Sequence, residues 1–446
     1  MAPGEGAQPG IVRRIYANLG LLLGGKAAAG LLSLAYMVIA ARTLGPVDYG
    51  VLILVHGFAM TVGGIVDFPG WHAVVRYGAR ATADGDTPRM MKLLRFTALV
   101  ETAGAVLAIA TVILMAPLIG PRLGWPPAAL AFAPYYSFAV LASARSTPAG
   151  LLQLVRRFDL LGLHNIVPPA VRLVGAGIVA LGGFGLIGFL VAWLVAAIAE
   201  WAAMWIFGLV VARRRFAGYP MRGGLKGVRA ENPGIWRFMI AANADVTFGE
   251  LAGRIAPLVV GWMLGPAGAG LYAVAQRATV IIAQPAQILG QAAYSELAKL
   301  VAAGGQGAAV RHALLRCVGV ALLSAIPVLA LLAFFSRQLA VLLGGAAFAA
   351  AAPLMIWLAG ARVVLLVAPP ASAALVAMGR PGLSVAANLT SSLGLLPFLP
   401  LLIYMGGLPG SGAHAVLQSL AASTLLALFV YRASAAHTPL PAPKAG

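Results

Sequence analysis

Long apolar runs dominate the sequence, and shorter polar connectors separate them. A helix needs roughly 20 apolar residues to cross the hydrocarbon core of a membrane. Measured in this way, the pattern predicts twelve spanning helices, and prolines and polar residues interrupt the fourth, fifth and eighth of them. The predicted spans cover approximately residues 15–41, 49–69, 95–119, 125–147, 162–183, 186–211, 236–264, 268–298, 312–335, 351–379, 382–406 and 409–432.

The composition is typical of a membrane protein rather than a soluble one. Of the 446 residues, 61% are hydrophobic and only 10% are charged, whereas a soluble domain is about 25% charged. Such a chain lacks the polar surface to cover a water-soluble core, which argues against soluble enzymes, nucleic-acid-binding proteins and disordered chains. Segment 15–41 is longer than the core of a signal peptide, so we expect it to be retained as the first span.

The basic residues indicate an orientation for this chain. Lys and Arg outnumber Asp and Glu by 31 to 12, which gives a formal net charge of +19. If the N-terminus is cytoplasmic, 23 basic residues fall on cytoplasmic segments and only Arg42, Arg122 and Arg337 fall on outer loops. Cytoplasmic loops of membrane proteins carry such an excess. The split predicts that both termini are cytoplasmic, and it explains the net charge without nucleic acid as a partner.

The longest basic connector, 212–235, divides the chain into two halves of six spans, 1–211 and 236–446. We expect this linker to be cytoplasmic and to act in membrane insertion and surface electrostatics. Each half contains the sequence Leu-Gly-Pro followed by Gly four residues later, at 44–50 and at 264–270, in the predicted loop after its first span. Because six is an even number, both halves start on the same side. The pattern therefore predicts parallel repeats about an axis normal to the membrane.

Basic side chains inside predicted spans are the strongest indication of function. An ionisable group at the centre of a bilayer is costly unless it faces a partner or a wet cavity. At 1.5 Å per residue, five such groups each lie roughly 15 Å from an end of their helix. This common depth favours the lining of one positively charged cavity, and salt bridges between helices are the alternative. The five residues are Lys26, Arg172, Arg254, Arg277 and Arg362.

Polar residues accompany these cations on the seventh and eighth spans. Spacings of four, three and four residues place a polar stripe on one helical face, formed by Asn243, Thr247, Glu250 and Arg254. Gln276 precedes Arg277 on the following span. Such side chains can bind sugar hydroxyls, or they can form hydrogen bonds between helices. We therefore interpret Asn243, Thr247 and Gln276, together with the five cations, as candidate substrate-binding residues.

Three acidic residues in the spans could carry a coupling proton or ion. They are Glu250 in the polar stripe, Asp245 on another face of the same helix, and Glu200 in the sixth span. Charge balance for a neighbouring arginine is the alternative role for each.

The sequence shows no motif for catalysis or for a cofactor. It has no nucleophile–base arrangement, no glycine-rich phosphate loop and no metal-binding spacing, and its one cysteine is Cys317. The predicted outer loops are also too short for a catalytic domain. We therefore expect a protein that is not an enzyme and uses neither a cofactor nor a metal.

Several short segments resemble those of a known family. The first is Ala41-Arg42-Thr43-Leu44-Gly45-Pro46-Val47-Asp48-Tyr49-Gly50, followed by Asp67, Gly70 and Arg76, although Pro69 departs from the usual form. Others are Leu151-Leu152-Gln153 with Arg156-Arg157-Phe158-Asp159, and Leu264-Gly265-Pro266 through Gly270-Leu271-Tyr272. Together they resemble the O-antigen and exopolysaccharide flippases of the multidrug/oligosaccharidyl-lipid/polysaccharide (MOP) exporter superfamily.

The resemblance implies an all-α, V-shaped transporter of twelve transmembrane helices in the bacterial inner membrane. Its implied cargo is an oligosaccharide on undecaprenyl pyrophosphate, moved from the inner to the outer leaflet for surface polysaccharide synthesis. Membrane lipids and other polysaccharide assembly proteins are the further partners that it implies. We expect alternating access through the cationic cavity, in which Arg254 and Arg277 hold the pyrophosphate while Lys26, Arg172 and Arg362 set the surrounding potential.

Three alternatives remain open at this point. A cation-coupled multidrug exporter of the same superfamily would favour acidic cavity residues. A membrane glycosyltransferase or polymerase would need a substantial outer loop with acid and base residues. A scaffold that does not transport would use the five cations only for packing.

Overall fold

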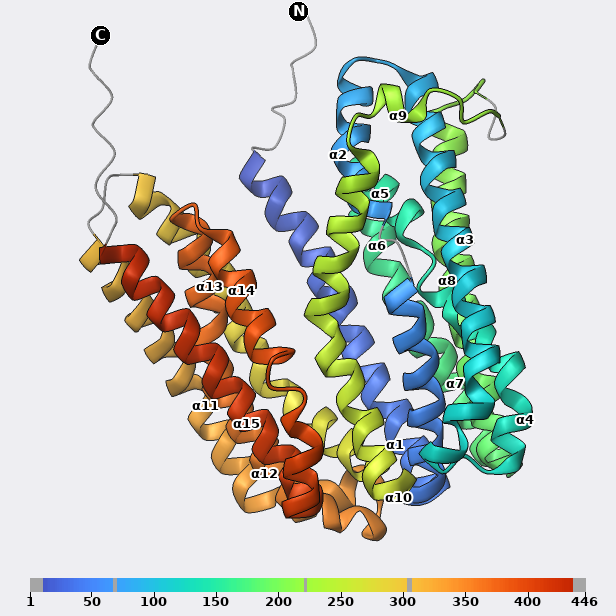
Figure 1. Ribbon diagram of the computed structural model, residues 1–446, viewed down its shortest axis with the longest axis vertical. Coiled ribbons are helices and arrows are strands. Elements are labelled where there is room, and N and C mark those ends of the chain that lie inside the picture. Colours follow the sequence, from blue (N-terminus) through green and yellow to red (C-terminus); the bar gives the residue numbers. More distant parts are fainter. Residues whose placement is uncertain (1–10, 67–69, 220–222, 303–306, 436–446) are drawn as a thin grey trace, which may run out of the picture. The chain divides into compact units, whose positions relative to one another are not determined.

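The computed structural model describes residues 11–66, 70–219, 223–302 and 307–435, and nearly all of these residues are helical (Figure 1). Side chains of residues 11–23, 245, 246, 249, 281–302, 307 and 308 lie outside the description. The helices of the first part are α1 (Ile11–Val66), α2 (Gly70–Ala83), α3 (Thr87–Ile119), α4 (Pro127–Tyr136), α5 (Ser146–Leu154), α6 (Phe158–His164), α7 (Val167–Gly182), α8 (Gly185–Arg215) and α9 (Val228–Glu231). Those of the second part are α10 (Ile235–Ala302), α11 (Gly307–Gly344), α12 (Ala352–Val364), α13 (Ala368–Ala377), α14 (Pro381–Ser392) and α15 (Phe398–Ala435).

Within the described ranges, nine helical stretches are long and apolar enough to cross a membrane. The twelve predicted spans reduce to nine partly because consecutive spans join. The first two predicted spans, for example, both overlap the single stretch Gly24–Ala83. The predicted span at 382–406 falls on the short helix α14 and the beginning of α15. The difference therefore lies in where helices are counted as ending, and the predicted apolar segments are helical.

Helices α1 and α10 each change direction at a glycine. Gly45 has φ 69° and ψ 178°, and Gly265 has φ 74° and ψ 178°. Only glycine adopts this backbone conformation readily. Each kink is followed by a proline and separates two predicted spans, so the predicted connectors after the first and seventh spans are present as sharp kinks rather than as loops.

The two kinks also pack against each other in a reciprocal way. A Cβ atom at Gly50 would collide with the carbonyl oxygen of Pro266, and a Cβ atom at Gly270 would collide with that of Pro46. Two equivalent segments that approach each other in this manner are what an internal two-fold axis produces. The matching sequences at 44–50 and 264–270 therefore correspond to matching structure.

Contacts divide the chain into two compact units, which differ from the predicted lobes at two places. Unit 1 is Met1–Thr43 with Val55–Thr247, and unit 2 is Leu44–Leu54 with Phe248–Gly446. The beginning of α10 belongs to unit 1 because Ile235 and Met239 are buried in its core. Residues 44–54 belong to unit 2 because they contain the reciprocal glycine contact.

The basic connector packs against unit 1 over part of its length. Lys92 of α3 forms an ion pair with Glu231 of α9, and the Tyr77 hydroxyl of α2 donates to the carbonyl oxygen of Pro233 at 3.1 Å. The side chain of Asn232 is fully buried and donates to the Val228 carbonyl oxygen at 3.1 Å. The second half of the predicted linker is therefore a structured cover on α2 and α3.

A core cluster of unit 2 combines alanines with larger apolar residues from four helices. Ala371 and Ala374 of α13 are fully buried, as is Leu426 of α15, and they pack with residues of α11 and α14. Small side chains allow membrane helices to approach closely, where van der Waals contact rather than the hydrophobic effect drives their association.

Candidate functional site

A cavity of about 340 Å³ lies inside unit 1 and is lined by both polar and charged side chains. It contains three residues that the sequence analysis singled out from separate spans, namely Lys26, Arg172 and Glu200. Helices α1, α6, α7 and α8 and the start of α5 form its walls. The other lining residues are Ala29, Ser33, Tyr36, Arg145, His164, Asn165, Pro168 and Pro169.

One face of α1 supplies the first wall of the cavity. Lys26, Ala29, Ser33 and Tyr36 are separated by three, four and three residues, so they fall on one side of the helix. The Lys26 side chain is exposed, whereas that of Tyr36 is half-buried. The helical spacing from Lys26 would have predicted Ser33 and Tyr36 as neighbours, because they occupy the same face.

Arg172 is held by neutral groups. Its Nη1 donates to the Tyr36 hydroxyl at 3.3 Å, and its Nη2 lies 3.3 Å from Nε2 of His56. The guanidinium also lies over the rings of Tyr36 and Trp193, with its central carbon 5.7 and 5.6 Å from the two centroids. A cation over an aromatic face is stabilised by the ring quadrupole. Among the described side chains, no carboxylate forms an ion pair with Arg172, although Glu200 interacts with it electrostatically at longer range. Its buried Nε has no hydrogen-bond partner.

Further contacts fix the groups around Arg172. Nδ1 of His56 lies 2.8 Å from the Tyr136 hydroxyl. The rings of Tyr36 and Trp193 meet edge to face, with centroids 5.2 Å apart. The guanidinium plane is therefore oriented by its surroundings before any ligand binds.

Glu200 has a direct ionic partner in the same cavity. Its carboxylate lies 2.9 Å from Nη2 of Arg145, and its side chain is only 13% exposed. The backbone oxygen of Glu200 lies 3.0 Å from Nε2 of His164. This geometry is the charge-balance arrangement that the sequence analysis left open for Glu200. It leaves Lys26 and Arg172 as the cavity cations that form no ion pair with a described carboxylate.

Sequence reasoning missed Arg145 and His164 as cavity residues. Arg145 was counted among the cytoplasmic basic residues, because it lies near the end of a predicted span. The structure places it just before α5, where its Nε donates to the Ala142 carbonyl oxygen at 2.7 Å. The spacing of residues along the chain did not predict that Arg145 and His164 would contact Glu200, because these contacts depend on how α5, α6 and α8 pack.

Glu101 of α3 is fully buried and fixes the beginning of α5. Its carboxylate accepts hydrogen bonds from the backbone N–H groups of Ser146 and Thr147, the second at 2.9 Å. These N–H groups at a helix N-terminus have no partner within the helix. A carboxylate there also interacts favourably with the helix dipole. Glu101 thus holds α5, and with it the neighbouring Arg145, in place.

The candidates on α10 pair among themselves. Arg254 forms an ion pair with Glu250 one turn away, and the two side chains are 36% and 56% exposed. The Thr247 hydroxyl lies 2.7 Å from Oδ1 of Asn243 and 3.1 Å from the Gly64 carbonyl oxygen of α1. The second contact is a hydrogen bond between helices, which is one of the two roles predicted for the stripe. The side chain of Asp245 lies outside the described residues.

The remaining candidates belong to unit 2. Arg277 and Gln276 are half-buried on α10, and the Gln276 carbonyl oxygen accepts from the Thr279 hydroxyl at 3.0 Å. Arg362 of α12 is half-buried and interacts electrostatically with the buried Tyr272. Lys26 and Arg172 belong to unit 1, so a single cavity shared by all five cations stays a prediction.

The geometry of the cavity in unit 1 suits binding of an anion. The cavity in unit 1 offers guanidinium and ammonium donors, a tyrosine hydroxyl and an asparagine amide, against one carboxylate that is already paired. Within the described part of the chain, no group of three or more His, Cys, Asp or Glu side chains could hold a metal ion. Phosphate oxygens are the ligands that arginine binds best.

Comparison with known proteins places this chain in a family. The profile of the family described as "Polysaccharide biosynthesis protein" matches residues 15–299. The chain is also 27% identical over 291 residues to the inner membrane protein YghQ of Escherichia coli (strain K12), a match that covers 65% of this chain and 82% of YghQ.

Solved structures with the same fold are transporters. An inward-facing multidrug resistance MATE family transporter of the MOP superfamily superimposes with a TM-score of 0.67 at 16% identity, over 95% of this chain and 98% of the other. A point mutant of the Vibrio cholerae MATE transporter VcmN gives a TM-score of 0.60 at 16% identity, over 95% and 99%. These matches confirm the predicted all-α transporter fold. The chain is a multi-pass inner membrane protein with the fold of the MOP transporters, and it belongs to the polysaccharide biosynthesis protein family.

Proposed function

We propose that the protein is a flippase, which translocates an oligosaccharide linked to polyprenyl pyrophosphate from the cytoplasmic to the outer leaflet. The observation that carries this proposal is the cavity of unit 1, where Lys26 and Arg172 form no ion pair with a described carboxylate. Arg172 is half-buried, and a cation that is partly removed from water without a paired counter-ion is costly. An anionic cargo that enters the cavity would supply the missing charge.

The position of Arg172 is suited to a pyrophosphate. Its guanidinium is oriented by Tyr36, His56 and Trp193, so little side-chain freedom would be lost on binding. A planar guanidinium can donate two parallel hydrogen bonds to phosphate oxygens, which an ammonium group cannot do. Lys26 would add a flexible second charge from α1.

The other parts of the cargo would meet different surroundings. Ser33, Tyr36 and Asn165 provide hydroxyl and amide groups in the same cavity for a sugar. The polyprenyl chain is apolar and would remain in the lipid. We propose that the cations of unit 2, Arg254, Arg277 and Arg362, contribute to recognition as well, and that alternating access carries the cargo across.

A cation-coupled multidrug exporter is the second candidate. The structural neighbours include multidrug resistance transporters. Glu200 also provides a carboxylate in the cavity, which could bind a proton or cation in place of Arg145. A cationic drug would nevertheless meet three basic side chains there, Lys26, Arg145 and Arg172. Repulsion in a site of low dielectric constant disfavours that cargo.

Reconstitution into proteoliposomes tests these proposals against each other. We expect the protein to move a pyrophosphate-linked oligosaccharide between leaflets, as measured by accessibility of the glycan to an external enzyme, and not to transport a fluorescent cationic dye. Transport of the dye without movement of the lipid-linked glycan would establish the exporter instead. Movement of neither cargo by folded protein would favour the scaffold.

A further inference from the structure

We propose that unit 1 carries a second anion site, which binds the phosphate group of an anionic phospholipid. A pocket of about 660 Å³ lies where α2, α5 and α8 end and α3 begins. Its volume lies within the range of about 300–1,000 Å³ that is usual for small-molecule sites. Four arginines line it, Arg156 and Arg157 from the link between α5 and α6, and Arg214 and Arg215 from the last turn of α8. The inference is independent of the proposed cargo.

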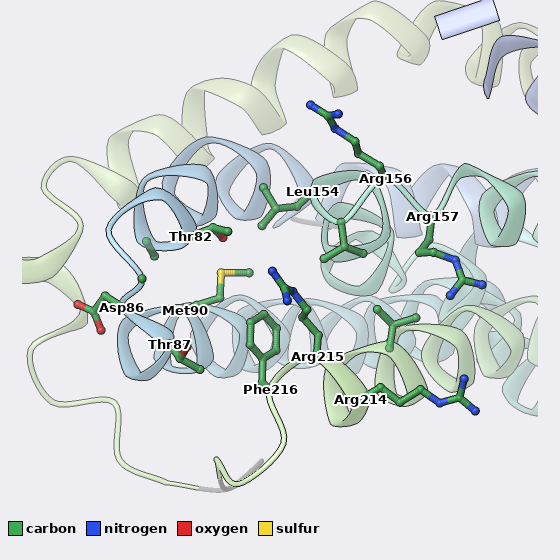
Figure 2. Close-up of a pocket in the computed structure, with 14 residues that line it drawn as sticks. Thr82, Asp86, Thr87, Met90, Leu154, Arg156, Arg157, Arg214, Arg215 and Phe216 are labelled. Atoms are coloured by element: carbon green, nitrogen blue, oxygen red, sulfur yellow. The ribbon is translucent and has the colours of Figure 1, made fainter. Parts of the chain in front are cut away.

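The side chains divide the pocket into a charged margin, where the arginines outnumber the single carboxylate of Asp86, and an apolar floor (Figure 2). In Figure 2 the Arg215 guanidinium extends into the space between Phe216, Met90 and Leu154, while those of Arg156 and Arg214 point outward. Thr82 and Thr87 add hydroxyl groups to the lining. This combination matches the chemistry of a phospholipid, in which the charged phosphate is followed by polar glycerol esters and then by apolar acyl chains.

The depth of the pocket favours a lipid as the source of the phosphate. Three apolar stretches end beside it, at Ala83, Leu154 and Arg215, and two begin beside it, at Thr87 and Phe158. The pocket therefore lies at helix ends just beyond the predicted spans 95–119 and 186–211, on the headgroup side of the hydrocarbon core. Basic pockets between transmembrane helices at this level bind anionic lipid headgroups.

The backbone at Arg156 provides an independent reason to assign a function to the pocket. Arg156 has φ 58° and is the only residue other than glycine with a positive φ in the described ranges. Its N–H donates to the Gln153 carbonyl oxygen at 3.0 Å, and the N–H of Arg157 donates to that of Leu152 at 2.8 Å. Helices usually end in this pair of hydrogen bonds with glycine at the left-handed position. An arginine there is disfavoured by its Cβ atom, so we infer that its guanidinium is retained for binding.

The four arginines are not equally available. Nε and Nη2 of Arg157 donate to the Asp159 carboxylate at 2.9 and 2.7 Å, and these hydrogen bonds raise the pKa of the Arg157 guanidinium. Arg156, Arg214 and Arg215 are exposed and form no ion pair with any described side chain. Binding would therefore depend chiefly on Arg215, which extends into the pocket, with Arg156 and Arg214 contributing from its rim (Figure 2).

The test compares three single variants of the full chain in a neutral detergent. Arg156→Gly and Arg215→Gln each remove a pocket cation, and Arg156→Gly also relieves the disfavoured backbone. Arg213→Gln is the matched control, because Arg213 belongs to the same basic turn of α8 and is exposed but does not line the pocket. Affinity is measured by calorimetry for short-chain phosphatidylglycerol, short-chain phosphatidylcholine and inorganic pyrophosphate.

We expect phosphatidylglycerol to bind more tightly than the other two probes. Loss of one charge-assisted contact should weaken it about fivefold in Arg156→Gly and in Arg215→Gln, and less than about twofold in Arg213→Gln. Equal losses in all three variants would show unspecific surface charge and overturn the proposal. Inorganic pyrophosphate binding as tightly as phosphatidylglycerol would overturn the lipid as the source. If Arg156→Gly fails to fold, Arg215→Gln against Arg213→Gln decides the matter alone.

Discussion

Unit 1 holds arginines in two different ways. In the cavity, Arg172 is fixed by a tyrosine, a histidine and two aromatic faces, and Arg145 is paired with a carboxylate. In the pocket at the end of the spans, Arg156, Arg214 and Arg215 are exposed. A buried guanidinium has to be oriented in advance, because desolvation is costly without partners. An exposed one can be oriented by its ligand. The first arrangement favours selectivity, and the second favours attraction of any anionic headgroup.

The orientation of the chain decides which leaflet the pocket faces. After replacement of Cys317 by alanine, single cysteines at Gly224 and Ala347 should react with an impermeant maleimide from opposite sides of the membrane, because the basic residues predict a cytoplasmic connector. Both positions are exposed, so each should be labelled completely from one side only. Labelling of both from the same side would contradict the predicted topology, and labelling of Gly224 from the outer side would assign the pocket to the outer leaflet.

Charge reversal should separate the two sites most strongly in activity. Arg172→Glu should lower translocation of a pyrophosphate-linked glycan by at least roughly 100-fold, because it places an anion against an anion in a medium of low dielectric constant. Arg214→Glu is the matched change in the exposed pocket, where solvent screens the charge, and it should lower translocation only a few-fold. Translocation is measured in proteoliposomes that contain equal amounts of each variant. Similar losses in both variants would show that the cavity and the exposed pocket do not differ in their importance for transport.

Exchange of arginine for lysine should separate geometry from charge. Arg172→Lys keeps the positive charge but loses the planar fork and the contact with His56, so we expect about a tenfold loss in translocation rate. Arg215→Lys should leave phosphatidylglycerol affinity within about twofold of the original, because an exposed charge adapts to its ligand. An unchanged rate in Arg172→Lys would show that only the potential of the cavity matters.

Variants of the Arg145–Glu200 ion pair test whether Glu200 only balances charge or carries a coupling proton or ion. Glu200→Gln should lower the free energy of unfolding by about 1–2 kcal/mol, a value between those of exposed and buried pairs, as measured by denaturation in detergent. The double variant Arg145→Gln with Glu200→Gln should recover much of that stability, because it leaves no unpaired charge. If the double variant is stable but no longer responds to a proton gradient during transport, Glu200 carries the coupling ion.

The smallest expected difference concerns salt. Raising the ionic strength from 0.1 to 1 M shortens the screening length from about 10 to about 3 Å. Affinity for short-chain phosphatidylglycerol should therefore fall several-fold, whereas the KM for the lipid-linked glycan should change by less than about twofold because Arg172 is largely removed from solvent. Equal salt dependence of both quantities would place the two sites in similar surroundings.

The sequence predicted the fold well because hydropathy and glycine chemistry are local properties. Apolar length identified the spanning segments, and the Leu-Gly-Pro repeats marked the kinks at Gly45 and Gly265. Common depth in the membrane grouped Lys26 and Arg172 with three other cations, and these two line one cavity, which Glu200 also lines. The depth of a residue within its span can be predicted from sequence, because a helix rises by a constant amount per residue.

The sequence could not predict which side chains meet at that depth. Arg145 meets Glu200 next to the start of α5, which the Glu101 carboxylate caps. Residue spacing along the chain does not indicate such contacts between helices. The polar stripe on α10 was assigned to the correct helical face, yet Thr247 bonds to the backbone of α1. Periodicity identifies the face of a helix, whereas the neighbour of that face is decided by tertiary packing.

The most direct test of the account compares two cargo lipids that carry the same glycan, one on a pyrophosphate and one on a single phosphate. Translocation of each is measured in proteoliposomes with the original protein and with Arg172→Lys. We predict that the original protein moves the pyrophosphate form about tenfold faster, through the bidentate contacts of an oriented guanidinium, and that this preference largely disappears in Arg172→Lys. Equal rates for both lipids with the original protein, or an undiminished preference in Arg172→Lys, would contradict pyrophosphate recognition by this cavity.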